Sequence, residues 1–183
     1  MAQALVNTGT FPNDTTGDPL QLAFQKVNAN FTELYADSPV LLTAVKPSTQ
    51  TLASSTVLTN DTALTLSLPI GRFALQAFLN IANVAGATGF KFAFAFTGTL
   101  SNGAYAQNGW INGAVTAAAL QNPVTNVTSY ATTDTSGDWV EINASFLVTV
   151  AGTLTLQWAQ NSSSASLTSM LQGSWLVANN GAG

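Results

Sequence analysis

The chain of 183 residues contains no histidine and no cysteine, and it has only four basic and eight acidic side chains. Without imidazole or thiolate groups, the usual ligand sets for zinc, blue copper, haem and iron–sulfur clusters are lacking. Catalytic Ser-His-Asp and Cys-His arrangements are excluded for the same reason. The few basic residues also cannot neutralise many phosphates, which is how affinity for nucleic acid arises. We therefore expect no cofactor, no nucleic-acid partner, and a structural or binding protein rather than a catalyst.

Charged residues make up only 7% of the chain, whereas a typical soluble domain carries roughly 25%. Hydrophobic residues make up 46%, so hydration of the surface falls to Thr, Ser, Asn and Gln side chains. One interpretation is a Thr- and Asn-rich β protein with an ordinary exposed surface. The other is that identical subunits bury much of the surface, since charge is depleted at the centre of such interfaces. The composition favours the second interpretation, an oligomer.

No segment has the pattern of a membrane span. The most apolar stretch, residues 73–85 (FALQAFLNIANVA), is shorter than the roughly 20 residues that a helix needs to cross a bilayer. The N-terminus lacks both the basic region and the apolar core of a signal peptide. We therefore expect no membrane insertion, and synthesis in the cytoplasm of the producing cell.

One stretch near the N-terminus predicts a helix over residues 19–36, within a separate N-terminal segment of residues 1–38. Asp18 is an N-cap candidate, Pro19 occupies the favoured first position, and Gln21 stands in capping-box spacing. Apolar residues recur in steps of four and three, which gives a heptad seam consisting of Leu20, Phe24, Val27, Phe31 and Leu34.

The seam must dock on another surface, because short isolated helices of about 12–15 residues or fewer are marginal in water. The helix could lie on the β domain of its own chain as an ordinary amphipathic helix. Alternatively, it could join a short bundle around a symmetry axis or insert into a partner. Periodicity alone does not separate these alternatives.

Residues 39–53 contain two prolines and are expected to form a linker, and from residue 54 to 183 the pattern predicts strands. The clearest strand is the segment 89–97 (GFKFAFAFT). Its alternation directs four rings to one face, those of Phe90, Phe92, Phe94 and Phe96. Four aromatic rings on one face indicate the inside of a sandwich or a subunit interface.

Two long strands near the C-terminus are expected to form a hairpin. The first covers residues 139–150, and Ala151 and Gly152 form a short turn. The second returns over residues 153–160, with Leu154, Leu156 and Trp158 facing inward. About eight strands without a helical pattern among them predict a mainly β fold, in which a short N-terminal helix precedes an antiparallel β-sandwich of the jelly-roll type. Its Thr- and Ala-rich outer faces suit packing against neighbouring subunits.

Candidate catalytic groups are sparse. Asp134, Asp138 and Glu141 cluster around one expected turn, and such carboxylates can hydrolyse glycosides or bind calcium. Their spacing matches no known ligand loop, so we favour a solvated turn and predict no metal site. Asp61 and Arg72 flank different strands and are expected to form at most a surface ion pair worth under about 1 kcal/mol.

Three aromatic residues, Trp110, Tyr105 and Tyr130, are candidates for surface recognition. Trp110 stands beside Gly and Asn in an expected long loop, residues 106–114 (AQNGWINGA). A flat ring in such a loop suits contact with a sugar or a protein. Packing of Trp110 in the core is an equally supported alternative.

The N-terminal residues 13–20 (NDTTGDPL), followed by 23–35 (AFQKVNANFTELY), resemble a segment common in virion proteins of tailed bacteriophages. There, an NDGTGD-like turn and an AFxKxNxNFxELY helix open tail fibres, spikes and other appendages. This sequence differs by having Thr15 and Thr16 in place of Gly-Thr.

A second and weaker resemblance covers residues 89–96 (GFKFAFAF), 154–161 (LTLQWAQN) and 173–176 (GSWL). These segments resemble a β domain at the ends of many phage structural proteins. That domain is similar to trimeric jelly rolls of the tumour-necrosis-factor or complement C1q type.

The resemblance implies a homotrimeric virion protein with three candidate roles. In the favoured role, the N-terminal segment attaches to other virion proteins, and the jelly roll faces outward as a capsid decoration, cement or short head fibre. In the second role, the trimer is a tail fibre or tail appendage that binds a host receptor or surface glycan. The third role, a glycan-depolymerising enzyme that uses Asp134, Asp138 or Glu141, is disfavoured, because such phage enzymes usually carry a solenoid repeat that this chain lacks.

Overall fold

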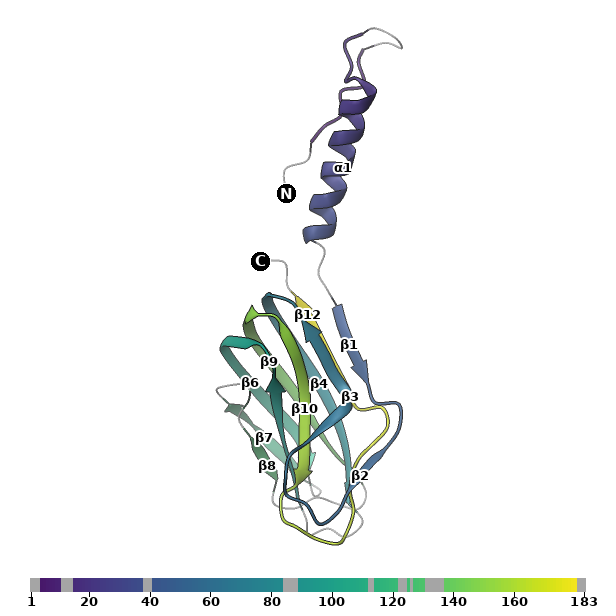
Figure 1. The fold of residues 1–183 in the computed structure, drawn as a ribbon. Coiled ribbons are helices and arrows are strands. Elements are labelled where there is room, and N and C mark those ends of the chain that lie inside the picture. Colours follow the sequence, from purple (N-terminus) through teal and green to yellow (C-terminus); the bar gives the residue numbers. More distant parts are fainter. Residues whose placement is uncertain are drawn as a thin grey trace. The chain divides into compact units, whose positions relative to one another are not determined.

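The computed structural model describes residues 4–10, 15–37, 41–83, 89–111, 114–121, 125, 127–130 and 137–180. The chain divides into two compact units, which consist mainly of Met1–Pro39 and Val40–Gly181. The first unit contains α1 (Leu20–Asp37) (Figure 1). The main-chain N–H of Ala23 donates to the Pro19 carbonyl at 3.0 Å, so helical hydrogen bonding starts at the expected proline.

The second unit is built from strands. In the described residues these are β1 (Leu41–Val45), β2 (Gln50–Leu52), β3 (Thr59–Leu68), β4 (Gly71–Asn83), β5 (Phe90–Phe96), β6 (Thr99–Ile111), β7 (Ala114–Gln121), β8 (Thr128–Tyr130), β9 (Asp138–Val150), β10 (Gly152–Gln160), β11 (Thr168–Met170) and β12 (Trp175–Asn180). They form two antiparallel layers, which Figure 1 shows one in front of the other.

The strand order is that of a jelly roll. The larger sheet runs β1-β12-β4-β9-β6-β7, with β11 joining β4 to β2, and the smaller sheet runs β3-β10-β5-β8. Eight of these strands carry the pattern: β1, β3, β4, β5, β8, β9, β10 and β12. When these eight are renumbered from one to eight in chain order, the larger sheet has the order 1-8-3-6 and the smaller sheet has the order 2-7-4-5. That arrangement is the double Greek key of a jelly roll, which confirms the predicted fold class. The hairpin of β6 and β7 widens the larger sheet beyond this pattern.

Side-chain alternation places the core between the two sheets. On β5, Phe90 and Phe92 are fully buried and Phe94 is 1% exposed, while Phe96 packs at the edge of the core. The Phe90 ring lies 6.1 Å from the ring of Trp158 on β10. The predicted inward positions of β10 and the phenylalanines of β5 are therefore confirmed as the inside of the sandwich.

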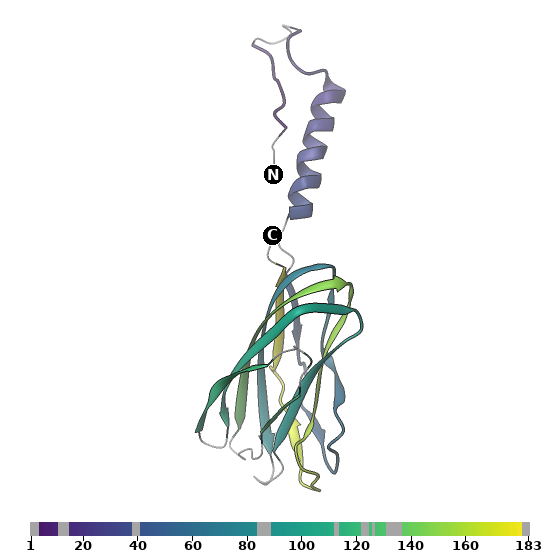
Figure 2. The same ribbon diagram turned by 90° about the vertical axis from the view of Figure 1, so that its left-hand side faces the viewer.

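Three chain segments pass from one sheet to the other at one end of the sandwich: β3 to β4, β5 to β6, and β9 to β10. Figure 2 shows these three arches side by side. The hairpin predicted at Ala151 and Gly152 is wrong, because β9 pairs with β4 and β6 whereas β10 pairs with β3 and β5. The short connection is real, but its two strands belong to different sheets.

Gly98 and Gly152 allow two of these arches to touch. A Cβ atom on Gly152 would lie 2.3 Å from the Gly98 nitrogen, and one on Gly98 would lie 2.1 Å from the Val150 carbonyl oxygen. Beside this contact, the N–H of Thr153 donates to the Thr97 hydroxyl at 2.8 Å. Both positions therefore require glycine for lack of space.

Two other predictions need correction. The linker expected over residues 39–53 contains β1 and β2, and β1 pairs with β12 along its whole length. The surface pair expected for Asp61 and Arg72 is also wrong, because Asp61 is buried and its Oδ2 atom lies 2.5 Å from the Nζ atom of Lys46. Sequence patterns missed this pair because Lys46 directly follows β1 of the larger sheet, whereas Asp61 lies on β3 of the smaller sheet.

The buried ion pair is well supplied with hydrogen bonds. The side chains of Lys46 and Asp61 are 4% and 0% exposed. The other carboxylate oxygen of Asp61 accepts the main-chain N–H groups of Ala63 and Leu64 at 3.0 and 3.1 Å, and the Lys46 ammonium also donates to the Gln50 amide oxygen at 3.1 Å. These partners offset the cost of removing two charges from water.

We expect the substitution Gly152→Ala to lower the free energy of unfolding by about 3 kcal/mol, because the new methyl group meets main-chain atoms that cannot rotate away. Urea unfolding followed by circular dichroism measures the loss. The neighbouring exposed substitution Ala151→Ser is the control and should stay within about 0.5 kcal/mol of the wild type. Equal stability of the two variants would contradict the close contact of the arches.

We expect Lys46→Met to lower the free energy of unfolding by about 3–5 kcal/mol, because it leaves the buried Asp61 carboxylate without its cation. Adding Asp61→Asn to this variant should recover part of the loss, since a neutral amide oxygen can still accept the two main-chain N–H groups. Lys91→Met, which removes a partly exposed lysine, is the control. A double variant less stable than Lys46→Met alone would contradict this account.

Candidate functional site

The chain start, residues 4–10, lies along α1 and is called the arm below. The Asn30 side chain pairs with the main chain of Ala4 in both directions, donating to its carbonyl and accepting from its N–H at 2.9 Å each. The Lys26 ammonium donates to the Leu5 carbonyl at 3.0 Å. Since Ala4 lies at Asn30 and Asn7 lies at Asp18, the arm runs antiparallel to the helix.

Asp18 forms hydrogen bonds with the other end of the arm, at Asn7. Its Oδ2 atom accepts the Asn7 N–H at 2.9 Å and lies 2.6 Å from the Lys26 ammonium, while its own N–H donates to the Asn7 carbonyl at 2.8 Å. The hydrogen bond from Lys26, followed by that from Asn7, lowers the pKa of Asp18 below its ordinary value of 3.8. The carboxylate predicted as an N-cap thus holds the arm.

The apolar stripe, defined as Leu20, Phe24, Val27, Phe31 and Leu34, lies on a different face of α1. Leu20 is 74% exposed, Phe24 59%, Phe31 53% and Leu34 49%, while Val27 is half-buried. At roughly 100° per residue, Lys26 and Asn30 point about a quarter turn away from the centre of the stripe. The arm therefore satisfies the polar side of the helix and leaves the stripe exposed.

The exposure of the stripe has an energetic consequence. Burying one Leu or Phe side chain is worth about 1.5–3 kcal/mol, so a partner that covers the stripe gains several times that amount. Large contiguous apolar patches on soluble proteins mark interaction sites. The seam predicted from the sequence is thus available for contact.

A second apolar surface lies on the outer face of the larger sheet. Phe78 on β4 stacks on Trp139 of β9 with ring centroids 5.7 Å apart and on Trp175 of β12 at 6.3 Å. These three residues are called the aromatic row. Trp110 of β6 pairs with Trp139 in the strand register, so it extends the row toward β7.

The recognition residues expected from the sequence are separated by the fold. Trp110 is 42% exposed, but it lies in β6 rather than in a loop. Tyr130 is partly buried on β8. The expectation for Tyr105 is wrong: it is 1% exposed, its hydroxyl is hydrogen-bonded to Thr128, and burial raises its pKa.

The carboxylates considered for catalysis do not form one site. Asp138 and Glu141 occupy positions of opposite parity on β9, so Asp138 points inward and is 2% exposed whereas Glu141 lies on the outer face. Asp134 lies outside the described residues. In the part of the chain that the structure describes, no three acidic side chains gather as metal ligands. A joint role of Asp138 and Glu141 is excluded by this geometry.

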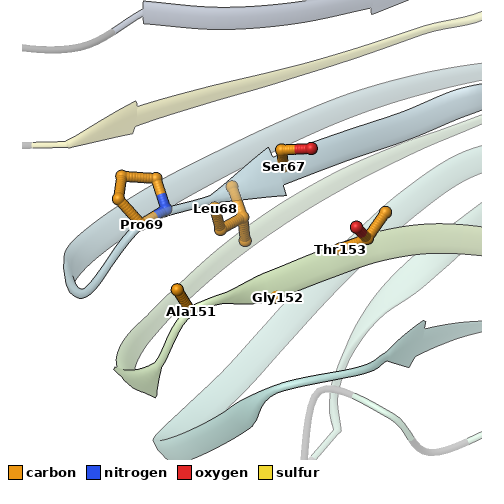
Figure 3. Close-up of a pocket in the computed structure, with 6 residues that line it drawn as sticks. All are labelled: Ser67, Leu68, Pro69, Ala151, Gly152 and Thr153. Atoms are coloured by element: carbon orange, nitrogen blue, oxygen red, sulfur yellow. The ribbon is translucent and has the colours of Figure 1, made fainter.

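Two of the arches border an open hollow of about 450 Å³. Figure 3 shows its lining, which comes from the ends of β3 and β10 and their turns and consists of Ser67, Leu68, Pro69, Ala151, Gly152 and Thr153. These residues offer two hydroxyl groups and no charged group. The hollow thus lacks the convergent polar groups that orient a small ligand.

Sequence patterns missed the arm and the aromatic row. Lys26 and Asn30 stand four positions apart, a spacing that places them on one side of a helix, and this was the available signal for the arm. The aromatic row could not be assembled from sequence, because its three residues come from strands that pair across the larger sheet. Among the described residues, no helix is long and apolar enough to span a membrane.

No protein-family model matches the chain, and no curated protein matches it. Among solved structures, a chain from the structure of infectious bursal disease virus Gx strain is similar at 10% sequence identity and a TM-score of 0.28. The likeness covers 78% of this chain and 39% of that chain, so this protein spans well under half of the other's length. A likeness this low carries no argument about fold or function.

We expect the contact between the arm and α1 to depend on pH through Asp18. Because the folded-state pKa of Asp18 is lowered, its contribution to stability is fully present above pH 3.8 and is lost as the pH falls through the lowered value. The chemical shift of the Asn7 amide proton, followed by NMR from pH 7 to 2, reports this loss. Asp18→Asn should give the low-pH shift already at pH 7, whereas Glu33→Gln should titrate like the wild type. An unchanged Asn7 signal in Asp18→Asn would contradict the role of this carboxylate.

Proposed function

We propose that this protein is a homotrimeric structural component of a bacteriophage virion, a capsid decoration, cement or short head-fibre protein. Residues 1–38 attach it to other virion proteins, and the jelly roll faces outward from the particle. The proposal needs no catalytic group and no cofactor.

The observation that carries the proposal is that two faces of α1 differ: one binds the arm, and the other is apolar and exposed. Asp18, Lys26 and Asn30 hold the arm, and the stripe from Leu20 to Leu34 remains exposed on an adjacent face. An apolar face that a small unit leaves uncovered is what an attachment element requires. The same three polar residues belong to the segment that resembles the openings of phage fibres and appendages.

The β unit supports the outward-facing part of the proposal. A jelly roll is a rigid sandwich, and its outer positions carry Thr, Ala, Asn and Gln far more than charged groups. Such a surface suits close contact with identical neighbours on a particle. A tail appendage with a receptor-binding role is the second candidate, favoured by the fibre-type N-terminal segment and by the exposed ring of Trp110.

We expect Phe31→Asp to abolish incorporation into virions while the purified protein keeps its β spectrum, because the substitution places a charge in the middle of the apolar stripe. Gln25→Asp is the matched control: it adds the same charge to an exposed position on another face of α1, and incorporation should persist. The measurement is the amount of protein in particles purified from cells that supply each variant.

Immunogold labelling or cryo-EM of the same particles locates the protein. Label over the capsid faces supports the decoration role, and label at the tail tip supports the appendage role instead. Absence of the wild-type protein from particles would overturn both. Normal incorporation of Phe31→Asp would show that the stripe does not attach the protein.

A further inference from the structure

An amine and a carboxyl group are in contact in the interior of the β unit. The Nζ atom of Lys46 lies 2.5 Å from the Oδ2 atom of Asp61, and the two side chains are 4% and 0% exposed. Burial away from water disfavours the charged forms of such groups and favours a free amine and a carboxylic acid. These two neutral groups are the reactants from which an amide bond forms.

The main chain of Lys46 is fixed by hydrogen bonds. Its N–H donates to the Ser174 carbonyl at 2.8 Å, and its carbonyl accepts the Gly173 N–H at 3.0 Å. The Lys46 ammonium also donates to the amide oxygen of Gln50 at 3.1 Å. The amine is therefore held next to the Asp61 carboxyl group, and such positioning turns an encounter between two reactants into a step within one molecule.

An irregularity in β3 supplies hydrogen-bond donors to Asp61. Between Asn60 and Thr65, β3 advances five residues while its partner β10 advances two. Within this bulge the main-chain N–H groups of Ala63 and Leu64 donate to the Oδ1 atom of Asp61 at 3.0 and 3.1 Å. Two fixed donors on one oxygen form an oxyanion hole, which stabilises negative charge that develops there during a reaction.

We propose that Lys46 and Asp61 condense to an intramolecular amide, which joins the residue after β1 covalently to β3. Nζ passes one proton to Oδ2 and then attacks Cγ as a free amine, so that negative charge moves to Oδ1, where the two N–H groups stabilise it. A second proton passes from Nζ to Oδ2, the bond from Cγ to Oδ2 breaks, and one water leaves while the Oδ1 carbonyl forms again. The reaction needs no oxidant, cofactor or other reactant.

The surroundings of the pair suit the amide product. Its remaining N–H has the Gln50 amide oxygen as an acceptor, and its carbonyl oxygen keeps the two main-chain donors, so the buried polar atoms of the amide are paired. The two buried charges disappear, which removes the cost of keeping them away from water. The same burial protects the new bond from hydrolysis.

The position of the bond gives it a mechanical effect. β1 lies at the end of the larger sheet and pairs along its length with β12. It is also the first strand of the β unit in chain order, so force applied through the N-terminal segment reaches β1 before the other strands. A covalent link to β3 therefore prevents β1 from being pulled away from the sandwich.

The test is mass spectrometry of the purified full chain and of its tryptic peptides. Residues 27–72 form one tryptic peptide that contains both Lys46 and Asp61, because Pro47 prevents cleavage after Lys46. We expect this peptide to be lighter than its sequence by the mass of one water in most molecules. Fragmentation of the main chain between positions 46 and 61 should not separate the two parts of the peptide.

Lys46→Arg is the matched control, because its guanidinium group keeps the positive charge but does not give up the proton that a nucleophile must lose. The peptide of this variant should have its full mass. A wild-type peptide of full mass in most molecules would overturn the inference and leave an ion pair at this place. A loss of water that persists in Lys46→Arg would also overturn it, since the loss would then come from another residue. The inference is independent of the proposed function, which the presence of the protein in virions tests separately.

Discussion

The jelly roll depends on the close passage of main chains at the end of the sandwich where its strands change sheets. Three arches lie side by side there, and at Gly98 and Gly152 two of them approach so closely that a Cβ atom would meet main-chain nitrogen and oxygen atoms. This contact fixes the spacing of the sheets at that end. The aromatic side chains of β5 and β10 fill the gap that it defines, and the outward positions of the larger sheet follow from the same alternation.

The parts of this fold that the sequence predicts are those with a strong local period. Alternation in 89–97 and 139–150 identifies β5 and β9 and their inward faces, and the heptad steps identify α1 and its stripe. Pairing of strands is not a local property. Ala151 and Gly152 have the chemistry of a tight turn whether the chain returns in the same sheet or crosses to the other, so a hairpin and an arch cannot be told apart there.

The same distinction accounts for the side chains that sequence patterns misplaced. Tyr105 lies in a stretch of Ser, Asn, Gly, Ala and Gln whose alternation carries no apolar signal, so its inward direction is set by the register with β9. Lys46 and Asp61 are polar residues that became buried only because two sheets meet around them. The segment of β1 has the pattern of a linker, because it is short and stands between prolines, and its partner β12 comes from the far end of the chain.

The arm has a practical consequence for work on this protein. Because it runs antiparallel to α1, Ala4 lies beside Asn30, which directly precedes Phe31 of the stripe. A tag or fusion added ahead of Ala4 would therefore emerge next to the apolar stripe instead of at the far tip of the unit. Labels for imaging or purification are better placed in the β unit, on the outer face of the smaller sheet.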